Sequence, residues 1–100
     1  MNLTIQAVNF TADQKLLDLT EKKVKKLDQY FDAITQVRVI LKLENKSSNI
    51  KDKAVEITLR MPGKDLFVKE ESKLFEESLD NAVSAIRRQL KRAKEKLRGV

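Results

Sequence analysis

Hydrophobic and polar residues alternate in three separate stretches of the chain. The first is short, with Leu3, Ile5 and Ala7 separated by polar residues. The second spans residues 36–44 and the third residues 55–61, each with valine, isoleucine or leucine at every other position. A period of two is typical of strands that bury one side and expose the other, so the pattern predicts three strands.

Two longer stretches repeat hydrophobic residues every three or four positions, which predicts two helices. The first follows Thr11–Gln14, which has capping-box spacing, and extends to about Tyr30. Its apolar stripe comprises Leu16, Thr20, Val24, Leu27 and Phe31. The second extends from about Ser72 to Arg98, before Gly99 as a stop signal. Its apolar stripe comprises Phe75, Leu79, Ala82, Val83, Ile86, Leu90, Ala93 and Leu97.

The segments between these elements complete the predicted fold. Residues 45–53 are polar and predict a loop, Pro62-Gly63 predicts a tight turn, and residues 66–68 predict a short fourth strand antiparallel to the third. The order is β-α-β-β-β-α. We therefore expect a single α+β domain over residues 1–100, with an antiparallel four-stranded sheet and two helices packed on one face. The other sheet face, with Arg38 and Arg60, would be exposed to solvent.

Composition narrows the functional classes. The 100 residues contain no His and no Cys and only two Gly, so the commonest general base, the usual zinc ligands and a glycine-rich phosphate loop are all missing. We expect a binding protein rather than an enzyme, with no metal, cofactor or small-molecule substrate.

The sequence also bounds the compartment of the protein. No apolar run approaches the roughly 20 residues that cross a bilayer, and the N-terminus does not have the pattern of a signal peptide. Together with the absence of cysteine, this predicts a cytoplasmic protein that does not interact with membranes.

Positive charge is concentrated at one end of the sequence. The net charge of the chain is +6, and residues 87–98 alone contain seven cations and one acid, so residues 1–86 are neutral overall. The cations are Arg87, Arg88, Lys91, Arg92, Lys94, Lys96 and Arg98. A neutral body with a cationic helical segment suits a polyanion partner. The alternative is that these cations only complement the helix dipole and aid solubility.

Helical periodicity places these cations beside the apolar stripe. At 100° per residue, one ridge contains Arg87, Lys91, Lys94 and Arg98, while Arg88 and Arg92 face away from the core. In the first helix, Lys15, Lys22 and Lys26 share a line, with Lys25 next to it. Side-by-side helices would place the two sets of cations along one groove. Interleaved acids in the first helix favour the plainer interpretation of a solvated surface.

Aromatic residues are too few for a base-stacking platform. The chain has five, and the pair Tyr30-Phe31 lies where the first helix ends, which favours packing against the core over stacking on bases. If RNA is the partner, we expect recognition to rest mainly on backbone charge and shape.

Three segments carry a family resemblance: residues 26–32 (KLDQYFD), residues 34–42 (ITQVRVILK) and the basic residues 87–97 (RRQLKRAKEKL). Together they resemble the bacterial ribosome hibernation-promoting factors. The resemblance extends over essentially the whole chain. It implies a domain similar to double-stranded-RNA-binding domains with an added first strand. It also implies binding to the small ribosomal subunit and its ribosomal RNA in the channel for messenger and transfer RNA, which blocks translation and preserves idle ribosomes when growth slows.

The resemblance also implies which residues bind RNA. In the closing helix they are Arg87, Arg88, Lys91, Arg92 and Lys94, and Arg98 extends the same ridge. Elsewhere they are Lys22, Lys25, Lys26 and Arg38. The chain ends at Val100, as expected for a short member of the family, and we expect the free protein to be monomeric. Glu76 and Glu77 depart from the family pattern and would repel phosphate.

Two other partner classes remain open from the sequence. The first is a protein-interaction module that modulates a transcription factor, and the second is a general binder of double-stranded RNA.

Overall fold

The computed structural model describes residues 1–44 and 52–97. Along the chain, these residues form β1 (Asn2–Val8), α1 (Gln14–Lys25), the 3-10 helix η1 (Lys26–Gln29), β2 (Gln36–Leu43), β3 (Lys53–Met61), β4 (Lys64–Ser72) and α2 (Phe75–Leu97). The predicted order β-α-β-β-β-α and the α+β class are confirmed. The predicted loop falls mainly on residues 45–51, and the predicted stop signal is Gly99, so both lie outside the described residues.

The described strands form one sheet in the order β1-β2-β3-β4. β2, β3 and β4 pair antiparallel, but β1 pairs parallel to β2, from Asn2 opposite Gln36 to Val8 opposite Lys42. The prediction of a fully antiparallel sheet was therefore wrong. The reason is that α1 carries the chain back along the sheet, so the next strand begins at the same end as β1 and runs in the same direction.

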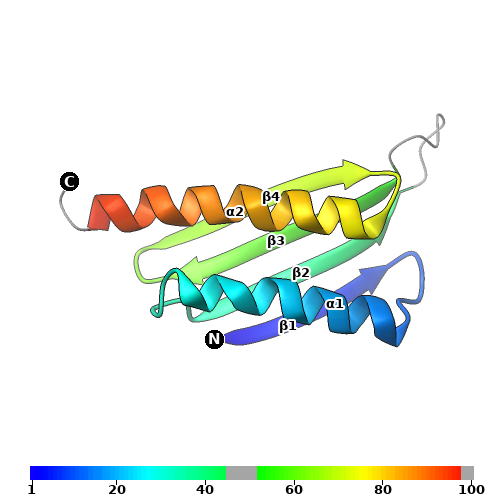
Figure 1. Cartoon of the computed structure of the whole chain (residues 1–100), viewed down its shortest axis with the longest axis horizontal. Helices are drawn as coiled ribbons and strands as arrows, with labels where there is room; N and C mark the ends of the chain where they lie inside the picture. The colour runs from blue at the N-terminus through cyan, green and yellow to red at the C-terminus, as the bar shows by residue number, and fades with distance from the viewer. Residues whose placement is uncertain (45–51, 98–100) are drawn as a thin grey trace.

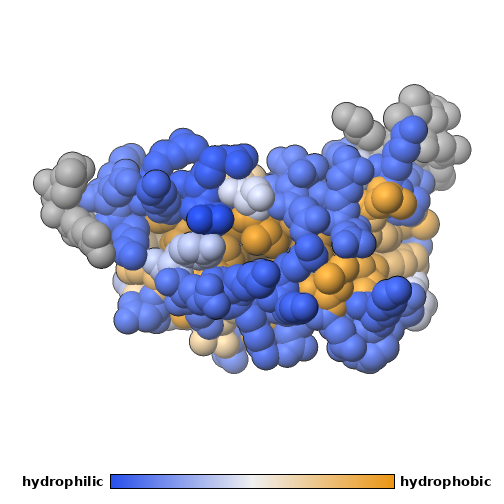
Figure 2. Space-filling model, in the orientation of Figure 1, coloured by the Kyte–Doolittle hydropathy of each residue, from blue (hydrophilic) through white to orange (hydrophobic). Residues whose placement is uncertain are grey.

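Both helices lie on the same face of the sheet, as predicted (Figure 1). α1 covers the side with β1, and α2 lies over β3 and β4. Each helix runs back along the sheet from the strand before it, so the two helices are parallel and their C-terminal ends lie at the same end of the molecule (Figure 1). Hydrophilic residues cover most of the exposed helix surfaces, with hydrophobic surface between the two helices (Figure 2).

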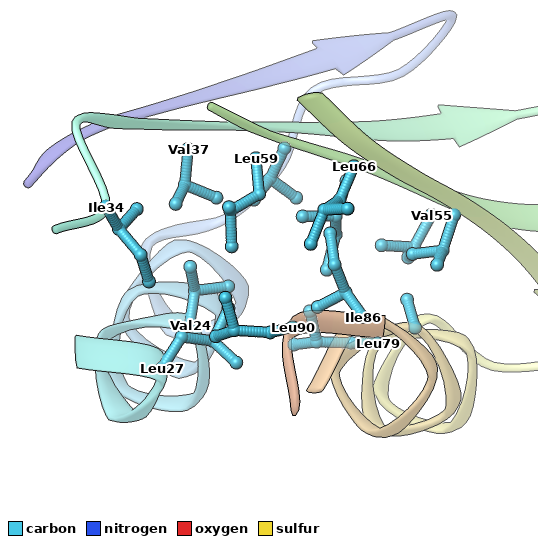
Figure 3. Packing of buried hydrophobic residues seen from close by; sticks show 14 of the residues in the cluster. Val24, Leu27, Ile34, Val37, Val55, Leu59, Leu66, Leu79, Ile86 and Leu90 are labelled. Carbon is cyan, nitrogen blue, oxygen red and sulfur yellow. The ribbon is translucent and has the colours of Figure 1, made fainter. Parts of the chain in front are cut away.

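The core lies between the sheet and the helices (Figure 3). The predicted inward residues of the second and third strands are buried, except Leu43, which is only partly buried. The buried ones are Val37, Val39, Leu41, Val55, Ile57, Leu59 and Met61. The helices add most of the predicted stripes, with Val24, Leu27, Leu79, Ala82, Ile86, Leu90 and Ala93 buried. Leu3 and Ile5 are only partly buried, because β1 is an edge strand.

Several predicted boundaries were wrong. Helix α1 is capped by Asp13, whose Oδ1 accepts a hydrogen bond from the backbone N–H of Leu16 at 2.8 Å, and not by Thr11. Gln14 does not reach back to a cap, because its side-chain amide donates to Asp18 at 2.8 Å. The α-helix ends at Lys25 and continues as η1 instead of reaching Tyr30 as a regular helix.

The fourth strand is nine residues long, rather than the short segment that was predicted. It pairs with β3 along its whole length, so α2 begins at Phe75 and not near Ser72. The predicted turn is confirmed, since Gly63 has a φ of +77° between Met61 and Lys64, which pair across it.

Buried hydroxyl groups fix the start of α2. The Ser78 hydroxyl lies 2.6 Å from the carbonyl oxygen of Lys53 in β3 and 2.7 Å from the hydroxyl of Ser72 in β4. The first turns of the helix are thus tied to both strands beneath it.

Candidate nucleic-acid interface

The C-terminal half of α2 presents its cations as the sequence predicted. Ile86, Leu90 and Ala93 are buried against the sheet, which fixes the rotation of the helix. The residues that we call the basic segment are Arg87, Arg88, Lys91, Arg92, Lys94 and Lys96. All of them are exposed except Lys94, which is partly buried. Arg98, also predicted as a site residue, lies outside the described residues.

The lysines of the first helix lie at the same end of the molecule as the basic segment. Lys22 and Lys25 are in the last turns of α1, and Lys26 begins η1. All three are exposed. Because α1 and α2 are parallel, their C-terminal ends, where the backbone dipoles also favour cations, are next to each other (Figure 1). Lys25 forms an exposed ion pair with Glu21 at 2.6 Å. Such a pair contributes little to stability, so Lys25 can leave Glu21 to bind a phosphate.

Tyr30, directly after η1, contacts two residues of the basic segment. The Arg87 guanidinium carbon lies 4.4 Å from the centre of the Tyr30 ring, within the range of a cation–π interaction. The Lys94 ammonium donates a hydrogen bond to the Tyr30 carbonyl oxygen at 2.9 Å. Tyr30 and Phe31 also pack against the core, which confirms the prediction of packing for this pair. The sequence had not indicated that Tyr30 would hold two of the cations.

These contacts divide the basic segment into two groups. Arg87 and Lys94 are engaged within the protein and have restricted side chains. Arg88, Lys91, Arg92 and Lys96 project into solvent. The second group is free to bind a ligand, and Arg88 and Arg92 offer the planar, bidentate donors that phosphate accepts well.

We expect Tyr30→Ala to lower the melting temperature of the protein and Tyr30→Phe to leave it nearly unchanged. The alanine variant loses ring packing and the cation–π contact with Arg87, which together stabilise by about 1–3 kcal/mol. That corresponds to a decrease of about 5–20 °C for a chain of this size. Thermal unfolding followed by circular dichroism measures both variants. Equal melting temperatures for the alanine variant and the unchanged protein would show that the ring does not hold the two elements together.

Arg38 does not join the other predicted site residues. It lies in β2 on the exposed sheet face, as the alternation predicted, and the helices cover the opposite face. Arg38 pairs with Thr58 of β3, which in turn pairs with Phe67 of β4. Any contact of Arg38 with RNA therefore belongs to a different surface.

Acidic groups lie near the other end of the helices. Glu76 and Glu77 are in the first turn of α2 and are exposed. Asp80 of α2 forms an ion pair with Lys23 of α1, which links the two helices. Asp52, just before β3, lies 2.8 Å from the Lys53 ammonium, and this hydrogen bond lowers the pKa of the Asp52 carboxyl. Within α2, the first turn therefore carries acids and the C-terminal half carries the cations.

No helix in residues 1–44 and 52–97 is long and apolar enough to cross a membrane. Within the same residues, no group of three or more acidic, histidine or cysteine side chains is arranged to hold a metal ion.

Comparison with known proteins identifies the class. Residues 3–98 match the family described as Sigma 54 modulation protein / S30EA ribosomal protein. The chain belongs to this family.

Curated relatives include ribosome hibernation promoting factors. The protein of that name from Salmonella typhimurium is 34% identical over 98 residues, which cover 98% of both chains. The one from Escherichia coli K12 is 33% identical over 98 residues with the same coverage.

Two solved structures have the same fold. A ribosomal subunit interface protein from Coxiella burnetii superposes with a TM-score of 0.84 at 22% identity, covering 95% of this chain and 99% of that one. The N-terminal domain of Protein Y from Thermus thermophilus superposes with a TM-score of 0.77 at 30% identity, covering 92% of this chain and 98% of that one.

Proposed function

We propose that this protein is a ribosome hibernation factor that binds the small ribosomal subunit and preserves idle ribosomes. The observation that supports this most strongly is the exposed basic segment, found in a chain whose relatives are named ribosome hibernation promoting factors. The protein acts as one ribosome-binding domain, in the cytoplasm and as a monomer when free. It has no enzymatic activity and needs no cofactor.

The proposed mechanism is occupancy. Arg88, Lys91 and Arg92 bind phosphates of ribosomal RNA, while Arg87 and Lys94 add positive charge from fixed positions next to Tyr30. Lys22, Lys25 and Lys26 extend the positive surface onto the neighbouring helical segment. Bound in the channel for messenger and transfer RNA, the folded domain excludes both by its volume, so translation stops without a chemical step.

The orientation of the domain follows from the distribution of charge along α2. Glu76 and Glu77 would be repelled by phosphate, so the first turn of α2 faces away from RNA while the basic segment faces it. A generally cationic protein would bind in many orientations. This one has a single favoured end, which suits a defined site on the ribosome.

Co-sedimentation tests this function. We expect the purified protein to sediment with small subunits and whole ribosomes at near-physiological salt, and to bind a generic RNA duplex much more weakly. If about six phosphates are contacted, the logarithm of the affinity should fall with the logarithm of salt concentration with a slope of roughly −4 to −5. Similar affinity for the duplex and the subunit would instead indicate a general double-stranded RNA binder.

A second candidate function is suggested by the family description, which also names sigma 54 modulation. In that case the partner is a protein that regulates transcription and offers an acidic surface to the basic segment. Absence of ribosome binding, together with capture of a transcription factor by the purified protein, would favour this function over the first.

A further inference from the structure

The exposed face of the sheet contains an aromatic ring and two arginines in neighbouring rows. Phe67 of β4 has a relative exposure of 52%, although phenylalanine is usually buried. It pairs with Thr58, and Thr58 pairs with Arg38, so the three residues form one row across β4, β3 and β2. Two strand spacings separate Arg38 from Phe67, which is about 10 Å between backbones.

The next row adds the second arginine. Gln36 pairs with Arg60, and Arg60 pairs with Asp65. A shallow hollow of about 50 Å³ lies between the two rows and is lined by Gln36, Arg38, Thr58 and Arg60. Sites for whole organic ligands are several times larger. The hollow instead suits a small polar group that accepts hydrogen bonds from several side chains.

The strand beneath the ring is held in place from the helix layer. The side-chain amide of Gln89 in α2 donates a hydrogen bond to the Phe67 carbonyl oxygen at 3.1 Å. Leu66 and Val68, on either side of Phe67, are buried in the core. The ring is therefore presented to solvent on a fixed backbone.

We propose that this sheet face is a second RNA-binding surface, on which Phe67 stacks an unpaired base while Arg38 and Arg60 bind the neighbouring phosphates. An exposed aromatic ring on a sheet, with arginines within reach, is the arrangement that recognises single-stranded RNA. Arg60 is diagonal to Phe67 on the adjacent strand, about 7–8 Å away. The inference rests on the proposed function for the source of the RNA, which is the ribosome. A domain in an RNA-lined channel would then contact RNA on both faces.

The chemistry of this face favours RNA over a protein partner. Stable protein interfaces have an apolar centre surrounded by polar groups. Here, among the described residues, Phe67 is the strongly exposed large hydrophobic side chain of the sheet face. Thr58 lies directly beside it, and Arg60 and Glu56 are its diagonal neighbours on β3. Asp65 lies 3.5 Å from Arg60, but both side chains are more than half exposed, so a phosphate can replace this carboxylate at little cost.

A tryptophan at position 67 provides a direct test, because the chain contains no tryptophan. In Phe67→Trp, we expect eight-nucleotide oligomers of uridine or adenosine to quench the fluorescence, since a stacked base lies against the indole. Adding Arg38→Ala and Arg60→Ala should weaken the affinity measured by this quenching by about tenfold or more. The matched control is Leu74→Trp, because Leu74 is 63% exposed and lies before α2, outside the sheet. Equal quenching of both reporters, or none at position 67, would overturn the proposal.

Affinity for small subunits separates stacking from simple hydrophobic contact. We expect Phe67→Leu to weaken binding by about five- to 100-fold, because leucine keeps apolar surface but cannot stack. Phe67→Tyr should bind like the unchanged protein. Equal affinity of Phe67→Leu and the unchanged protein would show that no base stacks on this ring and would contradict the proposal.

The two proposals fail in different ways. If small subunits bind the unchanged protein and Phe67→Leu with equal affinity, the sheet face is not a binding surface, and the basic segment stays the proposed site. If the unchanged protein does not bind small subunits, the proposed function is wrong. Quenching of the Phe67→Trp fluorescence by the oligomers would still support an RNA-binding sheet face in that case.

Discussion

We expect the replacement of Arg88 and Arg92 by glutamate to lower the affinity for the small subunit by about 100-fold or more while leaving the fold intact. Both side chains are exposed, so the core does not depend on them. A hydrogen bond to a charged group contributes about 1.5–3 kcal/mol, so losing two of them already accounts for 100-fold, and the new carboxylates repel phosphate in addition. The salt slope should become shallower by about 1.5, because each lost phosphate contact removes 0.7–0.9. Sedimentation or fluorescence anisotropy at several salt concentrations measures both quantities.

The control for this variant changes the net charge equally at the other end of the molecule. Lys15 in the first turn of α1 and Lys73 before α2 are both exposed. We expect Lys15→Glu with Lys73→Glu to reduce binding only slightly, through the long-range field. An equal loss of affinity in the two double variants would mean that total charge, and not the basic segment, governs binding, and the proposed site would be wrong.

The sequence predicted the elements whose evidence is local. Alternation in β2 and β3 identified their buried sides, because side chains of a strand point to opposite faces in turn. The narrow apolar stripe of α2 fixed the rotation of the helix, so the exposure of Arg88 and Arg92 followed from the spacing alone. These predictions required no knowledge of which segments meet in space.

Errors arose where distant segments or competing local groups decide the outcome. The direction of β1 relative to β2 depends on how α1 crosses the sheet, which alternation does not record. The length of β4 depends on its pairing with β3, since its residues 69–72 are mostly charged and have no apolar alternation. At the start of α1, Thr11 and Asp13 are both good caps, and spacing alone favoured the wrong one.

In the candidate site, too, the sequence predicted what depends on local spacing and missed what depends on contacts between distant segments. The basic segment could be listed from the sequence, but the contacts of Arg87 and Lys94 with Tyr30 join residues 57 and 64 positions apart. The sheet surface was missed for a related reason. The predicted fourth strand, residues 66–68, is too short to show which side chains point outward, and only the register with Thr58 brings Phe67 into line with Arg38.

The two helices depend on a shared core for their relative position, and Leu90 is central to it. Its side chain is fully buried and points from α2 toward Val24 and Leu27 of the first helical segment (Figure 3). We expect Leu90→Ala to lower the free energy of unfolding by about 2–5 kcal/mol, because it leaves a cavity at the point where both helices and the sheet meet. The melting temperature should fall by about 10–25 °C.

The matched control is Leu74→Ala, the same substitution at a leucine that is 63% exposed. Its effect should stay within about 0.5 kcal/mol, because it removes little buried surface. Urea unfolding of both variants gives the two free energies, and their denaturant slopes should be equal if both lose stability without a change in the unfolded state. Well below its melting temperature, Leu90→Ala should still bind small subunits, since Leu90 contacts the core and not the ligand. A variant that stays stable but loses ribosome binding would instead mean that the spacing of the two helices, which Leu90 maintains, is itself what the ribosome recognises.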